Sequence, residues 1–358
     1  KFKYIILLFL QTHINLMSFS TILIDWYLEN KRELPWRNTT NPYHIWLSEI
    51  ILQQTRVNQG LPYFESFTSN FPSINDLANA TEDEVLKLWQ GLGYYSRARN
   101  LHATAKFISA NLNGIFPKQY DEIIKLKGIG PYTAAAIASF AYKEQVAVVD
   151  GNVFRVISRY FGIFDDISTS KTRNVFQDLA NELICKSNPD LFNQAIMDFG
   201  ATQCTPKNPD CLNCVFQENC FAFRNQKTTE LPVKLGKTKV SNRYFNFIIY
   251  KDKSDFTIIE QRVEKGIWQN LFQFPLIETS ESVDLKNIKS LINESFQNIT
   301  KLNQTEIIHK LSHQKLHINF WELEVDEISN ENKISIEDLN TFAFPIVLSN
   351  FIKSHYEI

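Results

Sequence analysis

Two short segments constrain this chain more than any others. The first, residues 126–134, places Gly128 and Gly130 on either side of one residue and then continues as an apolar helical pattern. A Gly-x-Gly turn at a helix N-terminus can point backbone N–H groups at a phosphate, helped by the helix dipole. The second, residues 149–153, sets the carboxylate of Asp150 among apolar neighbours. Phosphate binding beside a buried acid indicates chemistry on a nucleic acid. A simple helix cap followed by an N-cap aspartate is the alternative, because short glycine motifs recur by chance.

The composition is that of a globular protein. The 358 residues are 44% hydrophobic and 21% charged, with no internal repeat, and this length favours two domains. A net charge of −2 does not by itself indicate a nucleic-acid-binding protein. Phosphate contacts need only a local basic stripe, however, and basic residues between Lys87 and Lys127 flank the glycine turn. Ordinary solvated helix faces would produce the same charges.

The N-terminal segment differs from the rest. Lys1 and Lys3 precede an apolar run that is too short to span a bilayer, and no small-residue cleavage site follows. Met17 directly precedes an amphipathic helical pattern. We therefore expect residues 1–16 to be an upstream extension or an over-called start, with a cytoplasmic location and no membrane role.

The hydrophobic pattern changes character along the chain. It is helical from about residue 19 to residue 223, and Thr81 with Glu84 forms a capping box for one of these helices. A polar stretch then separates this region from a part with strand-like alternation at residues 244–250, 256–260 and 316–320. The alternation slips at Trp321, which predicts a β-bulge. Helical patterns at residues 285–296 and 345–354 complete a predicted α+β domain.

Four of the five cysteines cluster in one segment. They are Cys204, Cys211, Cys214 and Cys220, separated by six, two and five residues, while Cys185 lies outside this spacing. Clustered thiols in a cytoplasmic chain indicate a metal site rather than disulfides. Zinc more usually takes two C-x-x-C pairs or histidines, and no histidine lies between the first and last of the four. Four thiolates in one loop suit a 4Fe-4S cluster, with zinc and disulfides as alternatives.

Glu49 is a second carboxylate in an apolar setting. It lies in the helical pattern of residues 43–55, where burial would raise its pKa and suit it to donate a proton near neutrality. A half-exposed structural glutamate is the alternative.

These segments together resemble one protein family. The glycine turn with Asp150 is similar to that of helix-hairpin-helix DNA glycosylases, and the cysteine spacing resembles the iron–sulfur loop of the endonuclease III superfamily. Residues 34–55 resemble the MutY-type adenine DNA glycosylases. The resemblance covers residues 19–225 and 242–358. It implies a mainly α catalytic region with a 4Fe-4S cluster, followed by an α+β Nudix-like C-terminal domain.

The resemblance also implies domain boundaries. They are an extension at 1–17, a helical glycosylase domain at 18–225, a linker at 226–241 and a Nudix-like 8-oxoguanine recognition domain at 242–358. Within the glycosylase domain, a six-helix module with the hairpin spans 35–143, and an iron–sulfur module spans 18–34 and 144–225.

Roles for individual residues follow from the same resemblance. Glu49 is expected to protonate adenine N7 and Asp150 to stabilise the cationic sugar, with Tyr132 and Asn152 supporting these two catalytic acids. The residues expected in the adenine pocket are Trp36, Arg37, Leu52 and Gln194. Those expected to contact DNA are Gln54, Thr55, Leu92, Tyr94, Gly128, Gly130, Ser312 and His313, with Gln54 and Tyr94 as wedges in the base stack.

The second domain carries a weaker set of motifs. Residues 266–275 resemble a segment of the family's Nudix-like domain, but no glutamate-rich Nudix box follows, so nucleotide pyrophosphatase activity is not expected. The family inspects 8-oxoguanine with a Phe-Ser-His loop, and the matching residues here are Leu311, Ser312 and His313. The resemblance thus implies a monomeric, monofunctional enzyme that flips and excises adenine opposite 8-oxoguanine or guanine in double-stranded DNA.

Two other functions are compatible with parts of the sequence. An endonuclease III-like glycosylase and lyase for oxidised pyrimidines would need a lysine for Schiff-base chemistry, and Tyr132 stands at the position where that subfamily carries it. A non-catalytic iron–sulfur DNA-binding protein would have no need of Glu49 and Asp150.

Overall fold

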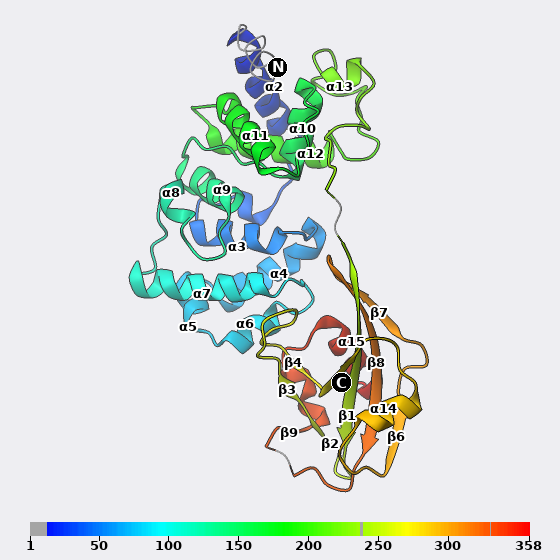
Figure 1. Ribbon diagram of the computed structural model, residues 1–358. Helices are drawn as coiled ribbons and strands as arrows, with labels where there is room; N and C mark the ends of the chain where they lie inside the picture. The colour runs from blue at the N-terminus through cyan, green and yellow to red at the C-terminus, as the bar shows by residue number, and fades with distance from the viewer. Residues whose placement is uncertain (1–12, 237–238, 330) are drawn as a thin grey trace. The chain divides into compact units, whose positions relative to one another are not determined.

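The computed structural model describes residues 13–236, 239–329 and 331–358, which form two compact units. The first unit combines the described residues up to Asp76 with Ala103–Gly236, and the second combines Leu77–His102 with the described residues after 236. Helices make up the first two thirds of the chain (Figure 1). They are α2 (His13–Asn30), the 3-10 helix η1 (Pro35–Arg37), α3 (Pro42–Leu52), α4 (Val57–Asn70), α5 (Ile74–Asn79), α6 (Glu82–Leu88), α7 (Ser96–Asn111), α8 (Tyr120–Ile123), α9 (Pro131–Tyr142), α10 (Gly151–Phe161), α11 (Ser170–Leu183), α12 (Pro189–Thr202) and α13 (Phe221–Arg224).

Local capping signals explain where several helices begin. The Asn41 side chain accepts a hydrogen bond from the backbone N–H of Tyr43 at the start of α3. Thr81 and Glu84 form the predicted capping box at α6. One boundary differs from prediction, because α2 begins at His13 and therefore ahead of Met17. The predicted extension at 1–17 falls largely outside the described residues.

The helices of the first unit pack so that four of them converge. Contacts join α3 to α9, α9 to α12, and α10 to α12, while α2 lies against α12. A core of large apolar side chains, including Phe19, Phe176 and Phe199, fills the space among α2, α10, α11 and α12. This packing brings together the C-terminal half of α3, the first turns of α9 and α10, and the middle of α12.

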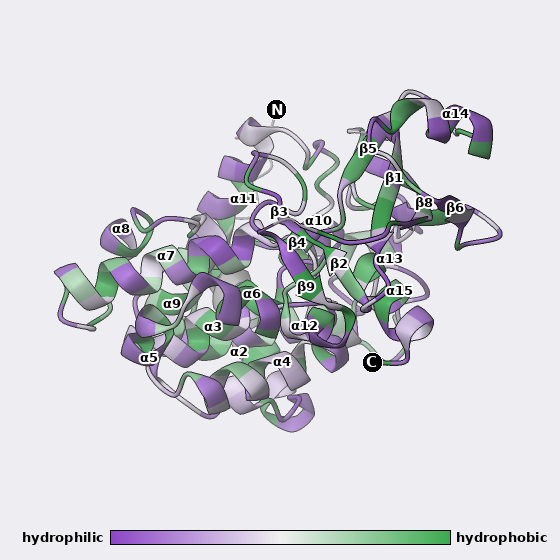
Figure 2. Cartoon of the chain, turned by 90° about the horizontal axis from the view of Figure 1, so that it is seen from below, coloured by the Kyte–Doolittle hydropathy of each residue, from purple (hydrophilic) through white to green (hydrophobic). Residues whose placement is uncertain are grey.

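The second unit contains a mixed sheet. Its strand order is β5-β1-β8-β6, with β7 also pairing to β8. Only the pairing of the long strands β1 and β8 is parallel among these, and much of β1 is green, hence hydrophobic, in Figure 2. The elements are β1 (Ser241–Lys251), β2 (Phe256–Ile258), β3 (Glu260–Gln261), β4 (Phe272–Gln273), β5 (Leu276–Thr279), α14 (Leu285–Leu291), β6 (Asn298–Lys301), β7 (Ile307–Lys310), β8 (Gln314–Glu324), β9 (Lys333–Ser335), the 3-10 helix η2 (Ile336–Thr341) and α15 (Ile346–Tyr356).

The predicted bulge at Trp321 is wrong. The register of β8 against β1 runs without a slip from Ser241–Gln314 to Lys251–Glu324. Trp321 belongs to an apolar cluster with Ile288 of α14, whereas the ring of Phe320 stacks on Phe351 of α15 with centroids 3.7 Å apart. Successive side chains of a strand point to opposite faces, so Phe320 and Trp321 lie on different faces of the sheet. A helix covers each face, and both residues are therefore buried although the strand is regular.

The predicted linker is partly packed. No helix or strand occurs between α13 and β1 among the residues described there. Yet Leu231 is buried, and its carbonyl accepts a hydrogen bond from the Arg159 guanidinium at 3.1 Å. In the described part of the chain, no helix combines the length and apolar character needed to cross a membrane.

Candidate active site

A pocket of about 170 Å³ lies where α3, α9, α10 and α12 converge. All eight residues predicted for catalysis or for adenine binding line it: Glu49, Asp150, Tyr132, Asn152, Trp36, Arg37, Leu52 and Gln194. They come from segments separated by more than a hundred residues of sequence, so only the packing of the helices assembles them. No lysine is among the described residues that line the pocket.

Glu49 projects from the last turns of α3 and is 7% exposed. Burial raises the pKa of its carboxyl to about 7, because the charged form loses its hydration. A hydrogen bond with the Tyr132 hydroxyl opposes this rise in pKa, and the neighbouring charge of Asp150 adds to it. A carboxyl with a pKa near 7 is about half protonated at neutral pH and can therefore donate a proton.

Asp150 is the N-cap residue of α10 and is half-buried. Its Oδ1 accepts hydrogen bonds from the backbone N–H groups of Asn152 at 2.8 Å and Val153 at 2.9 Å, and its Oδ2 accepts one from Asn152 Nδ2 at 2.9 Å. Burial raises the pKa of Asp150, while these donors and the charge of Arg155 lower it. The carboxylate is thus held in one orientation by groups that favour its ionised form.

Tyr132 lies in the first turn of α9, immediately after the glycine turn. Burial raises the pKa of its hydroxyl well above the usual value, and the adjacent Glu49 raises it further. The hydroxyl therefore stays neutral, and it also lies 3.8 Å from the sulfur of Met197. Tyr132 is thus hydrogen-bonded to Glu49 in the pocket, and its supporting role in catalysis stays a prediction.

Asp198 binds the pocket residue Arg37 without lining the pocket itself, and our sequence reasoning missed it. It is fully buried in α12 and accepts hydrogen bonds from Arg32 Nε at 3.0 Å and Arg37 Nη2 at 2.5 Å. Burial alone would raise the pKa of Asp198, but these hydrogen bonds lower it below the usual range. It follows Gln194 by one helical turn, so a charged residue at spacing i+4 in an apolar helix was the available sequence signal.

Gln194 is oriented by a separate contact. The Tyr27 hydroxyl donates a hydrogen bond to Gln194 Oε1 at 2.7 Å. The same aromatic ring lies 5.8 Å below the guanidinium carbon of Arg37. The side-chain amide of Gln194 is thereby left with its N–H groups as donors for a ligand in the pocket.

Arg155 joins the active-site pocket to the cysteine segment. Its guanidinium donates to Asn152 Oδ1 at 2.7 Å and to the carbonyls of Gly200 and Cys204 at 2.6 and 2.7 Å. α10 and α12 approach very closely here, since a Cβ built on Gly200 would lie 2.6 Å from the Cβ of Asn152.

The four predicted ligands Cys204, Cys211, Cys214 and Cys220 line one small apolar pocket beside α10. The described cysteines form no disulfide. Arg159 donates to Cys204 Sγ at 3.4 Å, and its own carbonyl lies 3.5 Å from Cys220 Sγ. Among the described residues, no three potential ligands are grouped tightly enough for a single metal ion. Four thiols that line one cavity are a ligand set that suits a 4Fe-4S cluster, in which each thiolate binds a different iron atom.

The glycine turn between α8 and α9 is exposed at both glycines. Gly128 has a φ of +76°, which an L side chain rarely adopts, and Gly130 is the N-cap of α9. Ile129 between them is buried, and the Lys127 carbonyl accepts a hydrogen bond from Thr104 at 2.7 Å. The buried Ile129 and the hydrogen bond from Thr104 thus hold the turn in place, while both glycines are exposed to solvent.

Gln54 and Thr55 follow the end of α3, close in sequence to Glu49. Gln54 is exposed and has a φ of +58°, a strained conformation for a residue other than glycine. Thr55 is half-buried, and its hydroxyl donates to the carbonyl of Gln53 at 3.3 Å.

The remaining predicted DNA contacts lie in the second unit. Tyr94 is 49% exposed with a φ of +49°, and its hydroxyl forms a hydrogen bond with that of Ser312 in the turn between β7 and β8. Both residues, with His313, line a cavity of about 480 Å³. Leu92 also borders this cavity, but it is only 6% exposed, so it supports the loop more than it presents a surface.

Comparison with known proteins matches both parts of the chain. A family of HhH-GPD superfamily base excision DNA repair proteins matches residues 47–182, and the NUDIX domain family matches residues 246–354. The adenine DNA glycosylase of Buchnera aphidicola subsp. Baizongia pistaciae is 37% identical and covers 91% of this chain and 92% of its own length. That of Buchnera aphidicola subsp. Schizaphis graminum is 38% identical over 84% of this chain and 86% of its own length.

Solved structures confirm the predicted helical fold. A thermostable thymine-DNA glycosylase matches with a TM-score of 0.55 and 28% identity, over 60% of this chain and 99% of its own. A trapped endonuclease III–DNA covalent intermediate matches with a TM-score of 0.50 at 20% identity, over 58% of this chain and 94% of its own. The pocket holds two carboxyl groups, and the curated relatives match most of the length of the chain. The chain therefore belongs to the adenine DNA glycosylase family and is a DNA glycosylase of base excision repair.

Proposed function

We propose that this enzyme excises adenine mispaired with 8-oxoguanine, and also with guanine, using Glu49 and Asp150 as its two catalytic acids. The observation that carries the proposal is the shared pocket, in which one carboxyl is almost fully buried and the other is hydrogen-bonded in one orientation. Two carboxyl groups of unlike environment suit the cleavage of a glycosidic bond through a cationic sugar.

The reaction needs a proton and a negative charge. Protonated Glu49 gives its proton to adenine N7, and the C1′–N9 bond breaks with its electron pair moving to the base. Asp150 stabilises the positive charge that develops at C1′. Water then adds to C1′ and releases a proton, which leaves an abasic site. Because the duplex hides these atoms, adenine must first be flipped into the pocket.

The pocket offers contacts that match adenine. Trp36 and Leu52 supply apolar walls, while Gln194 and Arg37 supply N–H donors for the acceptor nitrogens of the base. Because no lysine is found among the described residues of the pocket lining, we do not expect a Schiff base with the sugar. The enzyme is therefore proposed to be monofunctional.

Single-turnover assays on duplexes with A:8-oxoguanine, A:G, A:T and thymine glycol test this proposal. Asp150→Asn and Glu49→Gln should each abolish adenine release while duplex binding persists, and borohydride should trap no enzyme–DNA adduct. Normal turnover by either variant would contradict the proposed roles. Efficient trapping or cleavage at thymine glycol would favour an endonuclease III-like lyase instead.

Recognition of the opposite base is assigned to the cavity of the second unit. The serine and histidine of the Leu311-Ser312-His313 turn can hydrogen-bond a base edge, and Tyr94 presents an exposed ring for stacking. Leu311 offers a smaller apolar contact than the phenylalanine in the Phe-Ser-His loop of the family that the chain resembles. In the first unit, Gly128, Gly130 and Gln54 are assigned to DNA contact.

A 4Fe-4S cluster bound by Cys204, Cys211, Cys214 and Cys220 is the proposed cofactor. It would fix the segment of residues 204–220, including the exposed Lys207, without entering the hydrolysis itself. Purified protein should be brown and contain iron. A colourless, zinc-loaded protein would contradict this assignment.

The domain boundaries follow the same proposal. We assign a helical glycosylase domain to residues 18–225 and a Nudix-like recognition domain to residues 242–358, joined by the linker at 226–241. A monomer acting on the nucleoid in the cytoplasm is consistent with these roles.

A further inference from the structure

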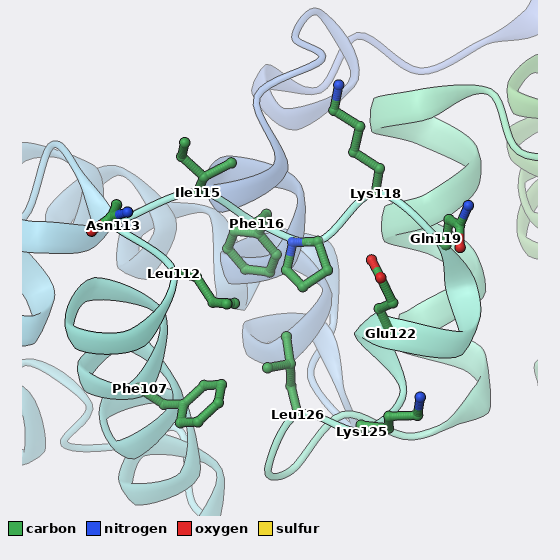
Figure 3. Close-up of a pocket in the computed structure, with 11 residues that line it drawn as sticks. Phe107, Leu112, Asn113, Ile115, Phe116, Lys118, Gln119, Glu122, Lys125 and Leu126 are labelled. Atoms are coloured by element: carbon green, nitrogen blue, oxygen red, sulfur yellow. The ribbon is translucent and has the colours of Figure 1, made fainter.

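An apolar groove of about 760 Å³ lies on the first unit, outside the active-site pocket. It is formed by the end of α7, the following loop and α8 (Figure 3). Its lining includes the apolar residues Phe107, Leu112, Ile115 and Phe116. None of the residues predicted individually for catalysis or DNA contact is among its described lining residues, although Lys118 and Lys125 of the lining belong to the basic stretch between Lys87 and Lys127.

The groove exposes large apolar side chains to water. Phe107 is 48% exposed and Ile115 is 66% exposed. Figure 3 shows Phe107, Leu112 and Leu126 directed toward the same hollow. Apolar surface is unfavourable when it is left in water, and contiguous exposed apolar surface marks interaction sites.

The groove is also held rigid from behind. Phe116 is buried and packs its ring edge against Trp46, with ring centroids 5.2 Å apart. The carbonyl of Phe116 accepts a hydrogen bond from the Tyr142 hydroxyl at 3.3 Å, and the N–H of Gly114 bonds the Ile108 carbonyl at 3.0 Å. A partner therefore meets a preformed surface and does not have to order it.

Basic residues outnumber acidic ones in the lining of the groove, which contains Lys118, Lys125 and Glu122 as its charged residues. Both lysines are exposed, and the ion pairs of the described residues involve neither of them. An occupant with apolar side chains for the floor and carboxylates for the two lysines would complement both features.

We propose that this groove docks a partner protein through a short linear segment that carries aromatic or aliphatic anchors flanked by Asp or Glu. A DNA backbone would pair with the lysines but would leave the apolar floor in water. A second copy of this chain would bring the same lysines against one another in a symmetric contact. An acidic segment with apolar anchors is the occupant that would both cover the apolar floor and pair with the two lysines.

Selection from a phage library of short random peptides against the full-length protein tests the proposal. The enriched peptides should combine apolar anchors with acidic residues. Ile115→Glu should weaken their binding at least about tenfold, which equals about 1.4 kcal/mol. Leu235→Glu is the matched control, because Leu235 is 71% exposed elsewhere in the same unit and its substitution should leave binding unchanged. Both variants should keep wild-type glycosylase activity and melting temperature.

Charge reversal separates the proposed occupant from the alternatives. The double variant Lys118→Glu, Lys125→Glu should no longer bind the selected acidic peptides. It should instead bind the same peptides after each of their acidic residues is replaced by lysine. Enrichment of no peptide, or of peptides without acids, would overturn the proposal. So would a reversal that weakens only duplex binding, or a concentration-dependent dimer that Ile115→Glu abolishes.

Discussion

At the scale of single residues, the two acids of the pocket differ in their surroundings. Glu49 is enclosed by apolar helix neighbours, whereas Asp150 caps a helix and accepts hydrogen bonds from its first turn. The rise in the pKa of Glu49 from 4.5 to about 7 corresponds to about 3 kcal/mol against its charged form. A carboxyl with such a pKa can supply a proton at neutral pH, as proposed for Glu49.

The proposed role of Glu49 predicts a pH dependence of catalysis. Because Glu49 is proposed to act in its protonated form, the single-turnover rate of adenine release should fall about tenfold per pH unit as the pH rises above about 7. Rapid-quench kinetics with A:8-oxoguanine duplexes would measure this fall. A rate that stays constant up to a pH of about 9 would show that Glu49 is not the proton donor.

Asp198 is expected to position the pocket without touching substrate. Asp198→Asn leaves the guanidinium of Arg37, whose side chain is 11% exposed, without its counter-charge and should destabilise the fold by about 3 kcal/mol. The uncompensated positive charge should also lower the pKa of Glu49, so the alkaline fall in rate should begin at a lower pH.

Asp190→Asn provides the matched control on the same helix, because Asp190 is paired only loosely with Lys143, at 3.8 Å. Denaturant unfolding and the pH–rate profile would compare the two variants. A purely structural role for Asp198 would change its stability but leave the profile in place.

At the scale of elements, the crossing of α10 and α12 sets the geometry of Asp150. Gly200→Ala would place a methyl group 2.6 Å from the Cβ of Asn152, so α10 or α12 must shift. We expect the rate of adenine release to fall about a hundredfold, because small displacements of catalytic groups have effects of this size. A folded variant with an unchanged single-turnover rate would contradict this view of the crossing.

Elements also show where pattern reasoning succeeds and where it fails. The capping box at Thr81 is local chemistry, and the structure contains it. The helix predicted at residues 285–296 ends at Leu291, and the bulge predicted at Trp321 is absent. Phe320 and Trp321 are both buried because α15 covers one residue and α14 covers the other. Both helices lie outside β8 in sequence, so the pattern of the strand alone does not reveal them.

At the scale of the whole molecule, residues 77–102 belong to the same compact unit as the C-terminal domain. Arg99 donates to the Gln269 carbonyl at 2.7 Å, and the hydroxyls of Tyr94 and Ser312 share a hydrogen bond. A loop from the helical region and a turn from the sheet therefore line one cavity.

This shared cavity leads to a prediction about partner discrimination. Ser312→Ala removes the hydroxyl that bonds Tyr94 and is proposed to contact the opposite base. It should lower the preference for A:8-oxoguanine over A:G by about tenfold, the effect of losing about 1.4 kcal/mol. Ser290→Ala is the control, since that hydroxyl bonds only the nearby carbonyl of Asn287 among the described residues. Competition between the two duplexes would measure the ratio, and equal ratios in both variants would argue against the assignment.

The sequence by itself determined the chemistry available to this protein. Helix caps, the glycine turn and the cysteine spacing are local features of the sequence, and pattern and resemblance were enough to propose Glu49 and Asp150 as catalytic acids. Only the tertiary structure decided how these groups act together. The pKa of Glu49 depends on its burial beside Tyr132 and Asp150, and the arginine pair depends on Asp198, more than a hundred residues away. Dielectric environment and long-range pairing arise from packing, which a local pattern does not contain.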